Sequence, residues 1–256
     1  MDSGNGIDVV KGKCALGKTC YPFHMSFDYK HITVDSEAEF IDRSSAELEQ
    51  AILDAIEEKG KCILGLSGGS TPKPIYEALG KLKAIEWHKV TIFLVDERYV
   101  PADHNESNQR MIRETLLKNS SIPEHQVIFP DTSLDLEECI EDYDFRIDQL
   151  MEEGIDIMAL GMGEDGHIAS LFPGDIDAIL EAEKKVIHTR TKKFAIEDRI
   201  TVTLPVLTSA GKQFFFLQGS KKKKIFAEVL SENEDPVEYP AHALLQTEKT
   251  VWVTQW

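Results

Sequence analysis

The chain has 256 residues, with 28 Lys and Arg against 45 Asp and Glu, which gives a formal net charge of −17 at pH 7. The hydrophobic share of 42% is that of a globular protein, and the length allows one large α/β domain or two small ones. The charge argues against a general nucleic-acid binder, because a phosphate backbone would be repelled, and no apolar run is long enough to span a bilayer.

The first 25 residues carry Gly, Lys and two Cys without any period, and a readable pattern begins only after Met25. We interpret 1–25 as a leader or a disordered N-terminus and 26–256 as a single domain. The four cysteines match no zinc pattern, so we expect reduced thiols. With no signal-peptide pattern near the start, these features predict a cytoplasmic protein.

Strands and helices alternate along the rest of the chain. The helix at 36–59 has Ile41, Leu48, Ile52 and Ile56 on one face and ends at Gly60. Short apolar runs such as 61–66 are typical of buried parallel strands. We expect strands at 29–34, 61–66, 89–95, 126–129, 155–160, 185–190, 199–204, 212–218 and 250–254, and helices at 36–59, from Pro72, at 106–118, at 135–153 and after two of the later strands. This order predicts an α/β fold: a Rossmann-like, mostly parallel sheet with helices on both faces.

Three segments rich in glycine and polar residues follow apolar strands directly, where ligands bind in parallel sheets. The first is a turn before the helix that starts near Pro72. Its glycines allow close backbone approach, and the helix offers unpaired N–H groups to a phosphate. An ordinary turn capped by Ser or Thr is the alternative. The candidate residues are Ser67, Gly68, Gly69, Ser70 and Thr71.

The second segment, 96–101, begins straight after the run KVTIFLV and changes abruptly from apolar to charged residues. Asp96 lies at the strand end, and Arg98 could supply positive charge, since its planar guanidinium suits phosphate. The alternative is a surface salt bridge between Arg98 and its acidic neighbours. Ser107 or Asn108 is a candidate cap for the following helix.

The third segment, 161–174, contains four glycines, Gly163 among them, and places Asp165 two positions before His167. Histidine is the side chain best suited to proton transfer near neutral pH, and Asp165 could orient it or a water molecule. A solvated loop histidine is the alternative. Arg199 begins the apolar alternation at 199–207, and Lys222 follows the apolar run FFFLQ, so either side chain could reach the same sheet edge. A run of lysines such as 221–224 usually forms a solvated face, which is the alternative for Lys222.

Taken in order, these segments resemble the 6-phosphogluconolactonase family, a branch of the sugar-phosphate isomerase/deaminase superfamily. The resemblance covers about residues 30–254. It depends on SGGSTP at 67–72, DERYVP at 96–101 with ESN at 106–108, GMGEDGHIASLFPG at 161–174, RITVTLPVL at 199–207 and GSKK at 219–222. Several motifs in the right order are far more specific than any one of them.

The resemblance implies hydrolysis of the lactone of 6-phosphogluconate in the oxidative pentose phosphate pathway. His167 would then be the general base that activates water, with Asp165 positioning it. The turn at 67–71, Arg98, Arg199 and Lys222 would bind the phosphate and nearby sugar oxygens. No metal or organic cofactor is implied. The expected partner is a small sugar-phosphate lactone, without nucleic acid or membrane, for a monomer or small homo-oligomer.

Two other functions are open on this pattern. Glucosamine-6-phosphate deaminases resemble the chain through DGHIA, but carry a catalytic Glu where this sequence has Phe172 and a Tyr where it has Arg98. Phenylalanine cannot transfer a proton, which argues against deamination. A non-catalytic sugar-phosphate sensor usually has a separate DNA-binding domain, for which this chain has no room.

Overall fold

The computed structural model describes residues 7–9, 29–231, 235–245 and 249–256. Within them, eight strands form one sheet in the order β1-β2-β11-β10-β7-β3-β4-β6, and the seven strands from β2 to β6 in that order are parallel to one another. The predicted mostly parallel sheet is confirmed. Its strands are β1 (Ile7–Val9), β2 (Lys30–Val34), β3 (Cys62–Leu66), β4 (Val90–Leu94), β6 (Val127–Ile128), β7 (Ile157–Leu160), β10 (Lys212–Gln218) and β11 (Thr250–Gln255).

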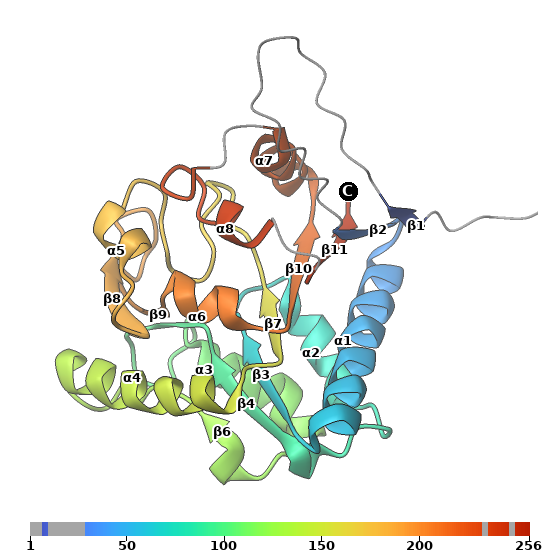
Figure 1. Cartoon of the computed structure of the whole chain (residues 1–256), viewed down its shortest axis with the longest axis horizontal. Coiled ribbons are helices and arrows are strands. Elements are labelled where there is room, and N and C mark those ends of the chain that lie inside the picture. The colour runs from blue at the N-terminus through green and yellow to red at the C-terminus, as the bar shows by residue number, and fades with distance from the viewer. Residues whose placement is uncertain (1–6, 10–28, 232–234, 246–248) are drawn as a thin grey trace, which may run out of the picture.

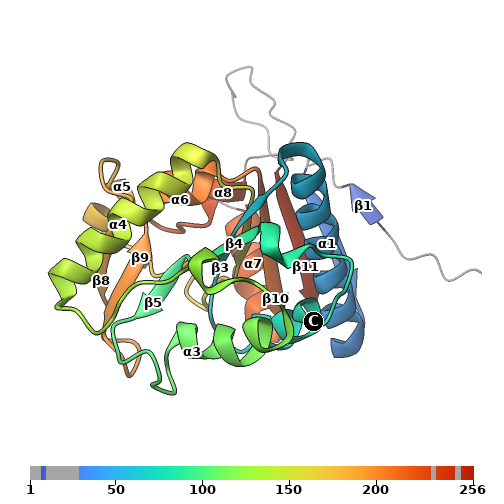
Figure 2. The same cartoon turned by 90° about the horizontal axis from the view of Figure 1, so that it is seen from below.

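Helices cover both faces of this sheet, as Figures 1 and 2 show. Along β10, Phe214 and Phe216 face the layer that contains α1 and α2, whereas Phe215 and Leu217 face the layer that contains α4, α6 and α7. This alternation buries both sides of each central strand. The helices are α1 (Glu37–Lys59), α2 (Pro72–Gly80), α3 (Asn108–Ile112), α4 (Leu136–Glu153), α5 (Ile176–Leu180), α6 (Leu204–Ser209), α7 (Ser220–Ser231) and α8 (His242–Leu245).

Local signals fix the ends of α1. The Ser36 side chain accepts a hydrogen bond from the backbone N–H of Glu39, and Gly60 stops the helix in the left-handed conformation, at φ 76°. The predicted helix at 106–118 is α3 followed by a π-helical turn at Arg113–Leu117. Short 3₁₀ turns at Trp87–Lys89 and Glu124–Gln126 precede β4 and β6.

A second, antiparallel sheet was not expected. It consists of β5 (Asp96–Arg98), β9 (Asp198–Val202) and β8 (Val186–Arg190), in the order β5-β9-β8. The sequence analysis expected no strand at Asp96–Arg98, but the chain runs from β4 through Val95 into β5, which pairs with β9. The Val95 carbonyl accepts a hydrogen bond from Val202 N at 2.9 Å, which joins the two sheets.

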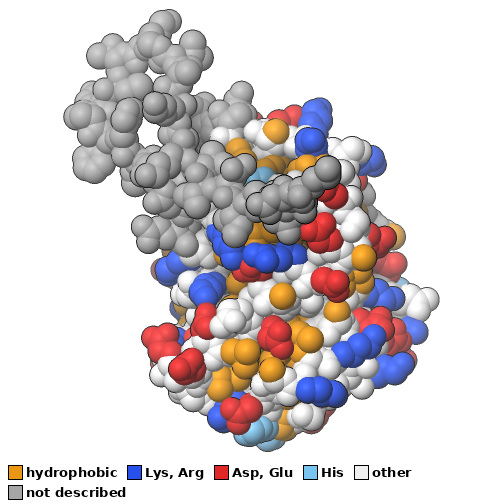
Figure 3. Space-filling view, turned by 90° about the vertical axis from the view of Figure 1, so that its right-hand side faces the viewer, with side chains coloured by type: hydrophobic (Ala, Val, Ile, Leu, Met, Phe, Trp, Pro, Cys, Tyr) orange, Lys and Arg blue, Asp and Glu red, His pale blue; other side chains and the backbone are white. Residues whose placement is uncertain are grey.

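The surplus of acidic residues lies on the outside. Charged side chains of both signs are interspersed with small apolar areas on the face in Figure 3. The helix α4 carries exposed carboxylates at positions such as Glu137 and Glu141, while Cys139 and Tyr143 on its inner face are buried. None of the described helices combines the length and the apolar character needed to cross a membrane. Of the predicted leader at 1–25, all but 7–9 lies outside the described residues; Ile7–Val9 pairs with β2.

The topology of the sheet determines where a ligand can bind. From β3 the chain runs through β4 to β6 on one side, then returns to β7 on the other side of β3 and continues through β10 to β11. The connection that leaves β3 therefore runs toward one edge of the sheet, and the connection that leaves β7 runs toward the other edge. Crevices of this kind, beyond the carboxyl ends of the strands, are the usual ligand sites of open α/β sheets.

Candidate active site

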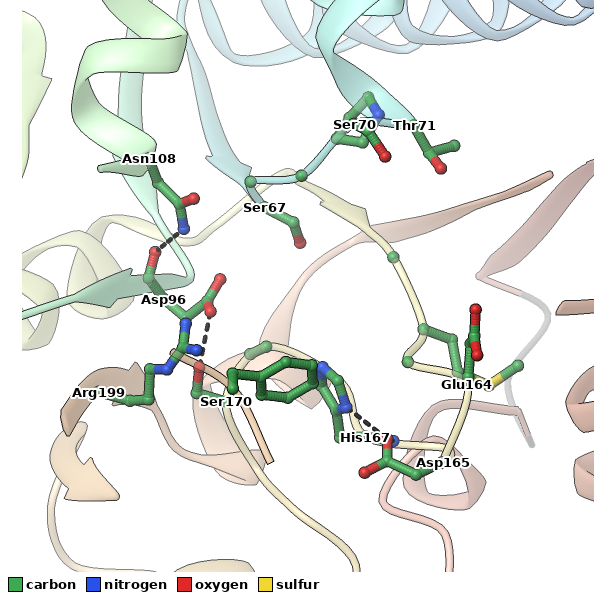
Figure 4. Close-up of a pocket in the computed structure, with 18 of the residues that line it drawn as sticks. Ser67, Ser70, Thr71, Asp96, Asn108, Glu164, Asp165, His167, Ser170 and Arg199 are labelled. Atoms are coloured by element: carbon green, nitrogen blue, oxygen red, sulfur yellow. Dashed lines mark hydrogen bonds and ion pairs between the residues drawn. The ribbon is translucent and has the colours of Figure 1, made fainter. Parts of the chain in front are cut away.

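A pocket of about 620 Å³ opens at the carboxyl ends of β3, β4, β7 and β10. Figure 4 shows Ser67, Asp96 and His167 around its central space. Every site residue that the sequence predicted lines this pocket: Ser67, Gly68, Gly69, Ser70, Thr71, Asp96, Arg98, Gly163, Asp165, His167, Arg199 and Lys222. Segments separated by more than 150 residues are thus brought together by the parallel strands.

His167 and Asp165 form a hydrogen-bonded pair, with 2.5 Å between Nδ1 and Oδ1. Burial would raise the pKa of the Asp165 carboxyl, but hydrogen bonds from His167 and from Lys193 outweigh it and hold this pKa well below its usual range. An ionised carboxylate only accepts hydrogen bonds. The proton of a neutral imidazole therefore lies on Nδ1, and Nε2 is left as a free base.

Glycine at position 163 leaves room for this pair. A Cβ at Gly163 would lie 2.1 Å from His167 Nδ1 and 2.6 Å from Asp165 Oδ1, closer than real side chains approach. The backbone N–H of Gly163 also donates to the His167 carbonyl at 2.8 Å, which closes the loop around the pair. The turn between them requires Gly166 at φ 84°. The glycines of this segment thus allow a tight loop in which the His167 imidazole packs directly against the backbone of Gly163.

Arg98 and Arg199 face each other across the β5–β9 pair, where their Cα atoms are register partners. Arg199 is only 6% exposed, and burial together with the neighbouring Arg98 lowers its pKa. The Nε atoms of both guanidinium groups are buried without a hydrogen-bond partner in the described chain. Like charges opposite each other in a sheet are destabilising, and a bound anion would relieve the repulsion.

The alternative of a surface salt bridge at Arg98 does not describe this arrangement. Its Nη1 donates to the backbone carbonyl of Glu106 at 2.6 Å, and among the described residues no carboxylate forms an ion pair with it. The adjacent Glu97 is turned the other way, into the start of α3. Burial raises the pKa of Glu97 to about 7, against four donors that lower it. These donors are the backbone N–H groups of Arg98, Asn108 and Gln109 and the hydroxyl of Ser107.

Asp96 is held from two sides at the same edge. Its carboxylate accepts a hydrogen bond from Ser170 Oγ at 2.7 Å, and its backbone carbonyl accepts one from Asn108 Nδ2 at 2.8 Å, as Figure 4 shows. The other amide atom, Asn108 Oδ1, packs against Gly68 and is buried without a partner. These contacts fix the wall that joins the β3 turn to β5. Ser107 caps α3 by accepting from Arg110 N, as the sequence allowed.

The β3 turn leads into the start of α2. Gly69 has φ 110°, a conformation that other residues rarely adopt, and Thr71 makes no capping hydrogen bond. The alternative of an ordinary capped turn therefore does not apply to Thr71. Ser67 Oγ is buried and unpartnered in the described chain, and points into the pocket in Figure 4. The hydroxyl is available to a ligand, as are the unpaired N–H groups of the helix start.

Lys222, rather than Lys221, points inward from the first turn of α7. Its ammonium group donates to the Met162 carbonyl, while Lys221 is exposed and pairs with Glu164 at 3.2 Å. The pKa of Lys222 is lowered, because the effect of burial outweighs the opposing effect of the Glu164 and Asp165 carboxylates. The pocket thus has cationic groups on two sides within a strongly acidic protein.

The sequence analysis missed several residues of the pocket. Lys193 and Phe194, from the loop between β8 and β9, contact the Asp165–His167 pair. Ser170 was not singled out, and Asn108 was considered only as a helix cap. The segment 191–197 mixes polar and apolar residues without a period, follows no long apolar run and has no glycine, so no sequence signal marked it. Phe172 packs against His167, with 5.1 Å between the two ring centroids. In the sequence analysis this residue argued against deamination.

Together, the fold and the pocket are those of an α/β protein with a histidine and several cationic side chains gathered at the ends of parallel strands. The model of the glucosamine-6-phosphate isomerases/6-phosphogluconolactonase family matches residues 35–252. The chain belongs to this family. The resemblance predicted from the motifs is confirmed.

Individual relatives agree. The chain is 41% identical to a probable 6-phosphogluconolactonase of Dictyostelium discoideum, over 86% of this chain and 94% of that one. The 6-phosphogluconolactonase of Thermotoga maritima is 36% identical in sequence, over 77% and 86%. A crystal structure of the T. maritima enzyme matches with TM-score 0.78 at 31% identity, covering 88% of this chain and 99% of that one. The Plasmodium vivax 6-phosphogluconolactonase matches with TM-score 0.81 at 30% identity, over 89% and 91%.

Proposed function

We propose that the chain hydrolyses 6-phospho-D-glucono-1,5-lactone to 6-phosphogluconate, the lactone-opening step of the oxidative pentose phosphate pathway. The observation that carries this proposal is one pocket that combines a carboxylate-bound histidine with two facing arginines, whose Nε atoms have no hydrogen-bond partner among the described residues. Such a pocket suits a phosphorylated substrate that needs proton transfer. The lactonase names of the relatives support the same substrate.

His167 acts as the general base in this proposal. Its unprotonated Nε2 accepts a proton from water while the water oxygen bonds to the lactone carbonyl carbon. The carbonyl electrons move to the oxygen, and the resulting oxyanion needs hydrogen-bond donors, which backbone N–H groups of the glycine-rich turns can provide. Asp165 fixes the ring through Nδ1 and stabilises the imidazolium as it forms.

The tetrahedral intermediate then collapses. The bond between the carbonyl carbon and the ring oxygen breaks, and the imidazolium of His167 returns its proton to that leaving oxygen. The products are a carboxylic acid, which ionises, and a hydroxyl group. Because the imidazole serves both proton transfers, the proposed reaction requires no metal or organic cofactor.

The phosphate and sugar oxygens bind to the groups that are otherwise unsatisfied. Arg98 and Arg199 offer guanidinium edges, and Ser67 offers a buried hydroxyl. The proposed set is completed by Gly68, Gly69, Ser70 and Thr71 in the β3 turn, Asp96 and Gly163 in the pocket walls, and Lys222 at the start of α7. This local positive charge would overcome the unfavourable field of an acidic protein on an anionic substrate.

Several predictions from the sequence belong to the same proposal: a leader or a disordered N-terminus at 1–25 before one domain at 26–256, the cytoplasmic location, the absence of a nucleic-acid partner, and a monomer or small homo-oligomer.

The test is turnover by the purified protein. The lactone is generated in situ from glucose 6-phosphate and followed by NMR beside a control without protein, because the lactone also opens spontaneously. Acceleration over that control is the expected result. Folded protein that gives no acceleration, or that releases ammonia from glucosamine 6-phosphate instead, would contradict the proposal.

A further inference from the structure

The loop between β8 and β9, residues 191–197, brings the ammonium group of a lysine to the histidine–aspartate pair. Lys193 Nζ donates to Asp165 Oδ2 at 2.6 Å, while Asp165 Oδ1 lies 2.5 Å from His167 Nδ1. Both carboxylate oxygens are therefore occupied, one by the base and the other by an ammonium group. Lys193 lies 28 residues from Asp165 in sequence, so the contact depends on the tertiary fold.

Packing holds this loop against the active site. Thr191 N donates to the Glu197 carbonyl at 3.0 Å across the base of the loop. The Phe194 ring meets the His167 ring edge-on, with 5.7 Å between centroids, and its own face lies 5.5 Å from the Arg199 guanidinium. Phe194 thus covers one side of the imidazole and anchors the segment that presents Lys193.

We propose that Lys193 is a positioning residue for the lactone-opening reaction, which holds the Asp165 carboxylate toward His167 and offsets the negative charge that the imidazole experiences. This role rests on the proposed function of His167 as a base. Lys193 itself takes no part in proton transfer.

The reason lies in the charge balance around His167. A carboxylate alone favours the protonated imidazole, which cannot accept a proton from water. Lys193 neutralises Asp165 and so keeps more of the base free at neutral pH, while the hydrogen bond still orients the ring. Among the described residues, the charged groups near the pair also include Glu164 on the same loop, Lys221 and Lys222 on α7, and Arg199 on β9 behind Phe194. All of these stay in place when only Lys193 is changed.

The direct test observes the imidazole without turnover. The ¹⁵N signals of His167 are followed against pH in the free protein and in Lys193→Met, Lys193→Arg and Lys192→Met. Lys192 is exposed in the same loop and has no ion pair among the described contacts, so its replacement controls for total charge. We expect Lys193→Met to raise the titration midpoint by about one pH unit. Lys193→Arg and Lys192→Met should stay near the wild-type midpoint. An unchanged midpoint in Lys193→Met overturns the proposal.

Kinetics then separate positioning from substrate binding. For Lys193→Met, kcat should fall about tenfold on the acidic side and stay near the wild-type value at alkaline pH, with KM unchanged. A raised KM with an unmoved pH profile would make Lys193 a substrate ligand instead, and an equal loss of kcat at every pH would make it merely structural. Wild-type protein without any turnover would refute the proposed function, whereas the NMR titration would still decide whether Lys193 governs the imidazole.

Discussion

Replacing Gly163 with alanine is expected to disable the active site while leaving the fold intact. The new Cβ would lie 2.1 Å from His167 Nδ1 and 2.3 Å from Cε1, whereas ordinary contact begins at 3.4 Å. The imidazole would have to move by about 1.3 Å to restore that contact. It cannot move freely, because Phe172 and Phe194 pack against it. The shift therefore breaks its alignment with Asp165 and with the pocket.

The expected loss can be stated as a rate. A displacement of about 1 Å at a reacting group costs on the order of 10²-fold, which corresponds to about 2.7 kcal/mol of transition-state stabilisation. Gly161→Ala is the matched control. It lies on the same loop and in the same pocket, but its Cβ would have nothing within 4 Å, and neither glycine has a positive φ that alanine would strain.

The assay is lactone hydrolysis by NMR for both variants, with the thermal midpoint measured in parallel. Gly163→Ala should lose about 10²-fold in kcat, while Gly161→Ala keeps activity within a few-fold. Full activity in Gly163→Ala would refute the inference that the imidazole must occupy the observed place. Equal losses in both variants would show that the loop backbone, not His167, is what the substitution perturbs.

Three further outcomes follow from the same structure. Arg98→Met should raise KM for the phosphorylated lactone at least tenfold but leave that for glucono-1,5-lactone nearly unchanged; equal effects on both would remove Arg98 from the phosphate site. Because the folded pKa of Asp165 lies below its unfolded value near 4, its stabilisation is present above about pH 4 and is lost as the pH falls further. The thermal midpoint of Asp165→Asn should therefore lie below that of the wild type at pH 7, and the gap should begin to narrow as the pH falls below about 4; a constant gap would contradict this. Trp252 is fully buried and stacks on Phe215, yet its indole N–H has no described partner. Unfolding by urea should show that Trp252→Phe costs less than about 1.5 kcal/mol, against about 3–5 for Trp252→Ala, and similar costs would contradict the packing argument.

The parallel sheet could be predicted because its central strands are buried on both faces. Runs such as 61–66 and 89–95 are apolar without alternation, and helices with one apolar face separate them. Their carboxyl ends meet at one edge, so polar residues that follow them in sequence converge in space. This is why eleven of the twelve predicted site residues meet in one pocket, whereas Arg199 reaches the same pocket from β9 of the second sheet; the roles of all twelve in binding and catalysis are still predictions.

The second sheet and the β8–β9 loop could not be predicted in this way. The strand β5 is the polar tripeptide Asp96–Arg98, and its pairing with β9 joins residues about a hundred positions apart, which no local period reveals. Lys193 follows another lysine between two strands, a pattern typical of a solvated loop. Only the fold brings Lys193 to Asp165 and shows that the two arginines face each other.

The central claim is that His167 is the base of a lactone hydrolase, and His167→Asn tests it most directly. Asparagine keeps a polar atom near the position of Nδ1 but has no group at Nε2 that can accept the proton from water. With the folded state confirmed by circular dichroism, kcat for the 6-phosphogluconolactone, corrected for spontaneous opening, should fall on the order of 10²-fold or more. A fall of less than threefold would contradict the role of His167 and the mechanism built on it.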